Sequence, residues 1–328
     1  PLLEKGLSMA HQQFELPHHY TPSTLTNAEG IKYKLQRTPS QIVLQGGNVR
    51  VAFDAQTGWM TQYVVDGTNF IGEQGALKPN FWRAVTDNDM GFGAPQKMAA
   101  WHHPELKLES ITPGIVKGKN TKEGAIVMAS YDMPAVKAKL SLTYRLQKDG
   151  TIVVNMAMKT DPTAKVSDML RFGMVLQMPY EMGNIRYFGR GPIENYSDRK
   201  ASERIGIYKQ TADQQFFPYI RPQENGTKQD VKWWQQTNVS GTGLEIHGEL
   251  GDLSMSALHY AIADLDDGLE KGQRHSYQVK KSPFTNLCID KEQTGVGGTN
   301  SWGEWPLERY RLHYGDRTYE FLLRPIVK

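Results

Sequence analysis

Residues 139–159 read KLSLTYRLQKDGTIVVNMAMK, and the alternation in this segment indicates the fold class. Apolar side chains occupy every second position before Asp149 and Gly150, and the alternation resumes after them. A period of two places apolar residues on one face of a strand, and Asp-Gly between two such runs is a strong hairpin signal. The segment therefore predicts an antiparallel β-hairpin. Its core residues are Leu140, Leu142, Tyr144 and Leu146 in the first strand and Ile152, Val154, Met156 and Met158 in the second.

The same alternation recurs along the chain, separated by short turn signals containing glycine. Helical periodicity is confined to short pieces at residues 97–102 and 202–207. The pattern predicts an all-β protein with many strands in a sandwich or barrel-like stack. The further candidate strands are residues 48–54, 59–65, 173–179, 185–189, 244–248, 254–260 and both arms of 309–325 around a Gly315–Asp316 turn.

Composition excludes several classes of function. The chain has 328 residues, of which 39% are hydrophobic and 22% are charged, as in ordinary globular proteins. No apolar run approaches the roughly 18 residues of a membrane helix, and a net charge of +3 without a basic stripe does not favour nucleic acid. We therefore expect no membrane or nucleic-acid partner. Cys288 is the single cysteine, which excludes an internal disulfide. The absence of disulfides suits the cytoplasm but does not exclude the periplasm.

A domain boundary is expected near the N-terminus, because residues 16–30 read LPHHYTPSTLTNAEG and are rich in turn-forming residues. We interpret residues 1–20 as the tail of a preceding domain, or as an arm laid on the main one. Residues 21–38 are then a linker, and residues 39–328 form one large β domain.

Four loop-like segments combine glycine or proline with charged and aromatic residues, a composition typical of loops that present a site on a β scaffold. They are residues 80–95, 187–200, 218–234 and 290–305.

The first segment contains Asp87, Asn88, Asp89 and Gly91. Its oxygen-bearing side chains can accept hydrogen bonds from sugar hydroxyls or bind a hard cation, and Gly91 would allow the loop to move. An Asx-type turn that only closes a strand crossing explains the same residues. Both interpretations stay open at this point.

The second and third segments offer charged and aromatic groups. Glu194 and Arg199 fit either a structural ion pair that pins a loop or a polar binding site. Glu224 lies near Trp233 and Trp234, which suggests a surface on which a sugar can stack. Because adjacent residues of a strand point to opposite faces, at most one of these two tryptophans can serve a given pocket.

The fourth segment, GVGGTNSW, places small and turn-forming residues before Trp302. An indole on such a loop can pack its flat apolar face on a sugar ring while its N–H group remains free to donate. A tryptophan that simply packs into the core is the alternative.

Motifs for other chemistries are missing from the sequence. The nine histidines fit no zinc spacing, and there is no nucleophile elbow or phosphate-binding loop. A glycosidase needs two carboxylates beside one bond, and spacing in sequence cannot reveal such a pair. A mutarotase-like enzyme would need a histidine and a glutamate that converge on a sugar. Candidates are His247, His259 and His275 with Glu194 or Glu224, and nothing in the sequence pairs them.

The four segments resemble motifs of the large bacterial β-galactosidases of the lactose-operon type, in retaining glycoside hydrolase family 2. FWRAVTDNDMG resembles the family's Arg-Ala-Pro-x-Asp-Asn-Asp-x-Gly, GRGPIENYSDR its Gly-Pro-x-Glu-Asn-Tyr-x-Asp-Arg, PQENG its Pro-x-Glu-Asn-Gly, and GVGGTNSWG its Gly-x-Gly-Gly-x-x-Ser-Trp. The resemblance covers residues 40–328. Departures are Val85, where the family often has proline, and Thr299 and Asn300, where acidic residues can stand.

This resemblance implies the C-terminal, small-chain region (domain 5) of such an enzyme, folded as an antiparallel super-sandwich like galactose mutarotases. It implies that residues 1–20 end an immunoglobulin-like domain and that a TIM barrel elsewhere carries the two catalytic glutamates. Trp302 then corresponds to a sugar-stacking tryptophan, and Asp87, Asn88, Asp89 and Gly91 to a mobile loop at the pocket mouth.

The function expected from the resemblance is completion of the sugar pocket, and of the assembly, of an enzyme that hydrolyses terminal β-galactosides with retention. The chain alone is expected to be inactive and to carry no cofactor, whereas the whole oligomeric enzyme would use Mg²⁺ and Na⁺ bound mainly at the barrel. Its compartment would be the bacterial cytoplasm or periplasm. The alternatives are a free-standing carbohydrate-binding module and a mutarotase-like epimerase.

Overall fold

A computed structural model describes residues 4–14, 30–117, 121–269, 272, 274–300 and 303–327. Within these residues the chain forms two sheets, of ten and nine strands, in which all pairing is antiparallel. The prediction of an all-β antiparallel sandwich is therefore confirmed.

The first sheet is built from the N-terminal strands and from later strands that return to it. In spatial order it contains β1 (Lys34–Arg37), β2 (Gln41–Gly46), β3 (Val49–Asp54), β4 (Met60–Val65), β6 (Leu77–Asn80), β11 (Arg171–Pro179), β18 (Phe284–Gln293), β17 (Leu253–Leu258) and β14 (Lys228–Val231), with β5 (Thr68–Asn69) paired to β4.

The second sheet has the predicted hairpin near one end. Its spatial order is β13 (Arg204–Thr211), β12 (Asn184–Gly191), β15 (Trp233–Thr237), β16 (Gly243–Gly248), β19 (Arg317–Ile326), β10 (Ile152–Thr160), β9 (Ala138–Gln147), β8 (Glu123–Met133) and β7 (Lys107–Ile115).

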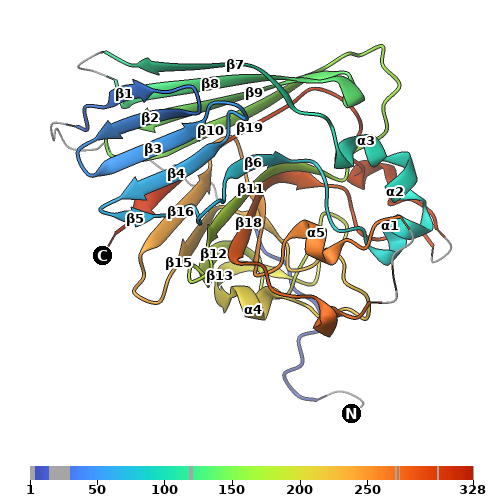
Figure 1. Ribbon diagram of the computed structural model, residues 1–328. Coiled ribbons are helices and arrows are strands. Elements are labelled where there is room, and N and C mark those ends of the chain that lie inside the picture. The colour runs from blue at the N-terminus through green and yellow to red at the C-terminus, as the bar shows by residue number, and fades with distance from the viewer. Residues whose placement is uncertain are drawn as a thin grey trace.

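Helices are short and lie in the connections between strands. Figure 1 shows α1, α2 and α3 gathered at the end of the sandwich away from the C-terminus. The helical elements are α1 (Asp87–Gly91), α2 (Ala94–Lys97), α3 (Ala99–His102), α4 (Ala212–Gln215) and α5 (Ile262–Leu265), with 3-10 turns η1 (Pro134–Val136), η2 (Ser276–Gln278) and η3 (Glu308–Tyr310). Among the described residues, none of these helices has the length and apolar character needed to cross a lipid bilayer.

The β9–β10 hairpin forms as predicted. Leu142 lies opposite Met156, and Tyr144 lies opposite Val154, with all four side chains buried. Gly150 adopts a φ of 87° in the turn, a conformation that glycine reaches without steric cost. The alternating pattern therefore places one face of each strand in the core.

Aromatic side chains join the two sheets across this core. Phe53 on β3 meets Tyr144 on β9 edge to face, with ring centroids 4.9 Å apart. Tyr63 on β4 donates a hydrogen bond of 2.7 Å to the carbonyl of Gly150 in the β9–β10 turn. Because edge-to-face contact is favourable for aromatic rings and the buried hydroxyl has its partner, these contacts fix how the layers stack.

Two sequence predictions are wrong. Residues 202–207 were expected to be helical, but Arg204–Thr211 is the edge strand β13. The burial pattern of this strand is irregular and lacks the clean alternation of an antiparallel strand with one buried face. The backbone pairing with β12 therefore overrides a weak helical period.

The second wrong prediction is the strand before the Gly315–Asp316 turn. β19 forms, but the preceding residues make the 3-10 turn η3 and an isolated bridge from Leu312 to Met169. Arg311 pairs with Asp168 at 2.7 Å, and the Leu312 N–H group donates to the Thr294 hydroxyl at 3.1 Å. These long-range contacts hold the segment away from a hairpin partner.

The N-terminal segment touches the edge of the second sheet. Gln13 exchanges two hydrogen bonds with the backbone of Ile205 on β13, at 2.9 Å and 2.6 Å. Residues 21–29, half of the expected linker 21–38, lie outside the described residues, and so do the ends of the expected tail 1–20. In the other half, Lys34–Arg37 forms strand β1 of the first sheet. The proposed boundary stays a prediction.

Candidate functional site

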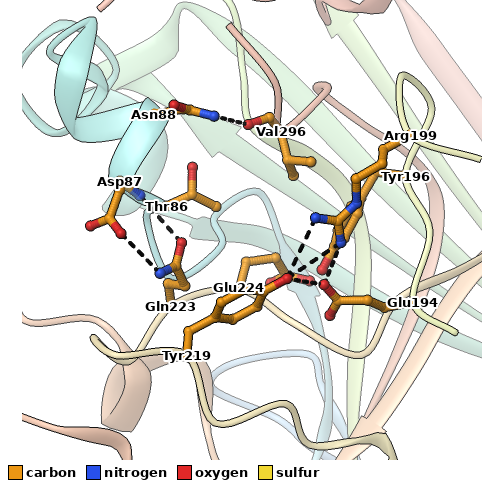
Figure 2. A pocket seen from close by; sticks show the side chains of 10 residues that line it. All are labelled: Thr86, Asp87, Asn88, Glu194, Tyr196, Arg199, Tyr219, Gln223, Glu224 and Val296. Atoms are coloured by element: carbon orange, nitrogen blue, oxygen red, sulfur yellow. Dashed lines mark hydrogen bonds and ion pairs between the residues drawn. The ribbon is translucent and has the colours of Figure 1, made fainter. Parts of the chain in front are cut away.

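All four segments that the sequence singled out contribute to one pocket. The pocket has a volume of about 230 Å³, and Figure 2 shows its lining side chains converging from loops far apart in the sequence. The lining residues are Thr86, Asp87 and Asn88 from the first segment, Glu194, Tyr196 and Arg199 from the second, Tyr219, Gln223 and Glu224 from the third, and Val296 from the fourth.

The first segment forms the helical turn α1 where the sequence predicted a loop. Thr86 caps it: the Asp89 N–H group donates to the Thr86 hydroxyl at 3.1 Å, and the Thr86 N–H group donates to the Asp89 carboxylate at 2.9 Å. This reciprocal capping box satisfies two backbone donors at the helix start. The turn directs Asp87 and Asn88 into the pocket wall.

Asp87 and Asn88 connect the first segment to two others. The side-chain amide of Gln223 donates to the Asp87 carboxylate at 3.2 Å, and Asn88 donates to the Val296 carbonyl at 2.8 Å. Both contacts appear in Figure 2.

Asp89 lies away from the pocket lining, in a buried ion pair with Arg83. The guanidinium contacts both carboxylate oxygens, at 3.0 Å and 2.7 Å, and both side chains are at most 1% exposed. Burial opposes the charge of Arg83, but the Asp89 carboxylate outweighs that penalty and raises the pKa of Arg83. Asp89 therefore holds the local structure, while its neighbour Asp87 reaches the pocket.

The same arginine attaches the first segment to the fourth. Arg83 donates to the carbonyls of Thr294 and Gly295, the latter at 2.9 Å. Gly91 lies directly against Gly303, because a Cβ atom added at Gly91 would approach the Gly303 Cα to 3.1 Å. The helical turn and the glycine-rich segment therefore pack as one body.

Trp302 lies outside the described residues, so its contact with a sugar stays a prediction. The neighbouring Trp305 stacks on Phe92 with ring centroids 4.3 Å apart, and the Arg311 guanidinium lies 4.4 Å from the Trp305 ring. Trp305 is thus engaged in packing beside the helical turns.

A charged group from the second segment and a tyrosine from the third form the opposite wall. Glu194 accepts hydrogen bonds from Arg199 and Tyr219, and also from the Gly226 N–H group at 2.7 Å. Burial opposes the charge of Arg199, but its contacts with Tyr219 and Glu194 raise its pKa. The ion pair pins the loop, and both side chains line the pocket, whereas the interpretation as a binding site stays a prediction.

Hydrogen bonds from Arg171 and Thr227 hold the Glu224 carboxylate in place on this side of the pocket. Arg171 donates to its Oε1 atom at 2.8 Å, and the Thr227 hydroxyl donates to the same oxygen at 2.9 Å. Arg171 is fully buried and also lies 3.2 Å from Asp290. Burial opposes its charge, but Asp290 and Glu224 raise its pKa, so the guanidinium remains a fixed cation beneath the pocket.

Tyr196 is the most buried aromatic residue of the lining. It is 2% exposed, and its hydroxyl has no hydrogen-bond partner among the described residues. Burial, then the Glu194 and Glu224 carboxylates, hold the pKa of Tyr196 well above its ordinary value. The hydroxyl therefore keeps its proton and is a donor at neutral pH.

Trp233, Trp234 and the three histidines considered from sequence lie outside the pocket lining. Trp234 is fully buried and stacks on Tyr187, whereas Trp233 is partly exposed and contacts Arg186, so the pair does face opposite ways. His247 pairs with Glu245 at 2.8 Å, His259 stacks on Tyr180, and His275 lies 3.2 Å from the Ile220 carbonyl. Within the part of the chain that the structure describes, no histidine lines this pocket.

A metal ion has no evident site here. Across the described ranges, no group of three His, Cys, Asp or Glu side chains could hold one. The Mg²⁺ and Na⁺ of the longer enzyme are expected mainly at the barrel, and that expectation stays a prediction.

The sequence singled out the pocket's four segments and part of its lining. Asp87, Asn88, Glu194, Arg199 and Glu224 were named from the sequence and line the pocket, whereas Thr86, Tyr219, Gln223 and Val296 were not considered. Composition cannot show which side chain of a loop turns inward. The signal that the sequence did offer was the composition of the four segments, each of which combines glycine or proline with charged and aromatic residues.

Two of the solved structures to which this chain has some likeness are named as sugar epimerases. A galactose 1-epimerase from Lactobacillus acidophilus NCFM has a TM-score of 0.45 and 12% identity, over 90% of this chain and 99% of that one. A putative aldose 1-epimerase from Escherichia coli K12 has a TM-score of 0.43 and 11% identity, over 91% of this chain and 100% of that one. This likeness concerns the arrangement of the sheets alone.

Curated relatives are named beta-galactosidase. The protein from Priestia megaterium is 28% identical over 98% of this chain and 30% of its own length. The protein from Lactobacillus delbrueckii subsp. bulgaricus is 30% identical over 90% of this chain and 29% of its own length. The chain thus spans about 30% of the length of the curated relatives it matches.

A family model described as beta galactosidase small chain matches residues 45–323, which is most of the sequence. The match includes all four segments that form the pocket. The chain therefore belongs to the beta galactosidase small chain family.

Proposed function

We propose that this chain is the C-terminal part of a β-galactosidase and supplies one wall of its sugar site. The observation that carries the proposal is the convergence of the four family-like segments on one polar pocket at one end of the sandwich. Relatives about three times as long carry the name beta-galactosidase, which fits a division of labour among domains.

The catalytic carboxylates belong elsewhere in this proposal. Retaining hydrolysis needs one carboxyl that donates a proton to the leaving group and a second that attacks the sugar. In the pocket, Glu194 is committed to Arg199 and Tyr219, and Glu224 to Arg171 and Thr227. Both are held as anchoring carboxylates, so binding suits them better than proton transfer.

The remainder of the enzyme, with a TIM barrel and immunoglobulin-like domains, is the proposed partner. It would contribute the two glutamates, the Mg²⁺ and Na⁺ sites and further contacts of an oligomer, and the substrate would be a terminal β-galactoside. Trp302 would stack on the sugar from the fourth segment.

Hydrolysis of a chromogenic β-galactoside tests the proposal. The chain is assayed alone, and then after mixing with a separately expressed remainder of the enzyme. We expect no turnover alone and recovered turnover on mixing. Turnover by the chain alone would place the carboxylates here, and no recovery with a folded partner would favour a free-standing carbohydrate-binding module.

A substitution tests the role of Trp302. In the assembled enzyme, Trp302→Ala is expected to raise KM for the galactoside, because the sugar loses a stacking face, and to change the unfolding temperature less than it changes KM. Unchanged kinetics would remove Trp302 from the sugar site.

A further inference from the structure

The hydroxyl of Tyr196 is the starting observation. It is buried, it belongs to a residue that lines the pocket, and it has no hydrogen-bond partner among the described residues. A buried hydroxyl without a hydrogen-bond partner destabilises the folded state. A phenylalanine at this position would have nearly the same shape and no unsatisfied oxygen. We therefore expect a ligand in the pocket to be the hydrogen-bond partner of this hydroxyl.

A second polar group beside it is also incompletely used. Both hydrogen bonds to Glu224 involve Oε1, which leaves Oε2 without a donor from the described residues. Arg171 and Thr227 hold this carboxylate in place before any ligand arrives. Tyr196 and Glu224 both line this pocket, so an unpartnered donor and a fixed acceptor belong to the same cavity.

Charge restricts what can bind between them. Three carboxylates, of Asp87, Glu194 and Glu224, line the pocket. Arg199 pairs with Glu194 and the buried Arg171 pairs with Glu224, which leaves one excess negative charge and disfavours an anion. No metal-binding group occurs among the residues that the structure describes. A neutral ligand with adjacent hydroxyl groups satisfies both an acceptor and a donor, because each hydroxyl can donate and accept.

Size restricts the ligand further. Pockets for drug-sized molecules are about 300–1,000 Å³, whereas this one is about 230 Å³. One sugar ring suits this volume better than a disaccharide. Tyr219 and Val296 add an aromatic and an apolar surface to the lining, which suits the C–H face of a pyranose.

We propose that this pocket binds a single neutral monosaccharide, with Glu224 accepting from one ring hydroxyl and Tyr196 donating to a neighbouring one. The inference goes beyond the proposed function, because it assigns a ligand to this chain without its partner. It rests on the proposed function only for the choice of D-galactose as the first probe.

The test is calorimetric titration of the folded chain with D-galactose and with D-glucose. We expect saturable binding of at least one of the two sugars. Tyr196→Phe is expected to weaken that binding about fivefold, and Glu224→Gln at least about tenfold, as for loss of a neutral and a charged hydrogen bond.

Matched controls separate binding from folding. Tyr144→Phe removes another buried hydroxyl that has no partner, from a residue on β9 outside the pocket lining, and should leave the affinity unchanged. Tyr196→Phe removes only an unpartnered oxygen, so its unfolding temperature should equal or exceed that of the wild type. This variant keeps the test decisive if Glu224→Gln fails to fold because Arg171 has lost a counter-charge.

The outcomes distinguish this inference from the proposed function. A chain that restores β-galactosidase activity on mixing but binds neither sugar alone overturns the inference and leaves the proposed function standing. A chain that binds a sugar but restores no activity on mixing supports the inference and overturns the proposed function. Binding that Tyr196→Phe leaves unchanged, or that Tyr144→Phe weakens equally, also overturns the assignment of this pocket.

Discussion

Asp89→Asn and Asp87→Asn make a matched pair that separates structure from binding in one helical turn. Both substitutions remove one negative charge from the first turn of α1. Asp89 is buried against Arg83 with two hydrogen bonds, whereas Asp87 is exposed at the pocket. The structure therefore predicts opposite consequences for two residues that are chemically identical in sequence.

The magnitude follows from burial. Breaking one partner of a buried ion pair costs about 3–5 kcal/mol, because an uncompensated charge is left behind. Asparagine keeps one acceptor oxygen, and Arg83 keeps the carbonyls of Thr294 and Gly295, so we expect a loss of about 3 kcal/mol for Asp89→Asn. At the exposed position, Asp87→Asn should change stability by about 0.5 kcal/mol or less.

Equilibrium unfolding in urea, followed by tryptophan fluorescence, measures both values. The slope of unfolding free energy against urea should be the same for both variants, so the midpoints report stability directly. In titrations with D-galactose we expect the opposite ranking. Asp87→Asn should lower the affinity more than Asp89→Asn does, although it changes stability less. Equal losses of stability in the two variants would refute the assignment of Asp89 to the ion pair and Asp87 to the pocket.

Three further measurements follow from buried groups. Burial lowers the pKa of Lys228 to about 8, so the unfolded state binds more protons than the folded state between pH 8 and 10.5. The free energy of unfolding should therefore rise with pH in this window, and Lys228→Met should abolish that slope. Burial raises the pKa of the Cys288 thiol to about 12, so mass spectrometry should find it alkylated by iodoacetamide after unfolding but not in the native chain. A Cβ atom at Gly173 would lie 1.9 Å from the Asp290 carboxylate, so Gly173→Ala should lower the free energy of unfolding by more than about 2 kcal/mol, while Gly315→Ala, in open space, should not.

Local pattern determined much of this architecture. The alternation in residues 139–159 and the turn at Gly150 predict the β9–β10 hairpin correctly, because strand period and turn chemistry depend on neighbouring residues. The same reasoning correctly predicts that Trp233 and Trp234 face opposite sides of β15. It fails for residues 202–207 and for the strand before Gly315, where an edge strand and long-range contacts override local preference.

Some features of the candidate site can likewise be predicted from the sequence, and others depend on the fold. The sequence alone marks the four segments that build it, since glycine, charge and aromatic residues gather in each. Only the tertiary structure decides that Asp89 turns to Arg83 while Asp87 enters the pocket, and that Arg171 reaches Glu224 across 53 residues of chain. The physical reason is that the residue type alone sets the charge of a side chain, whereas its partner and its burial depend on which strands the fold brings together.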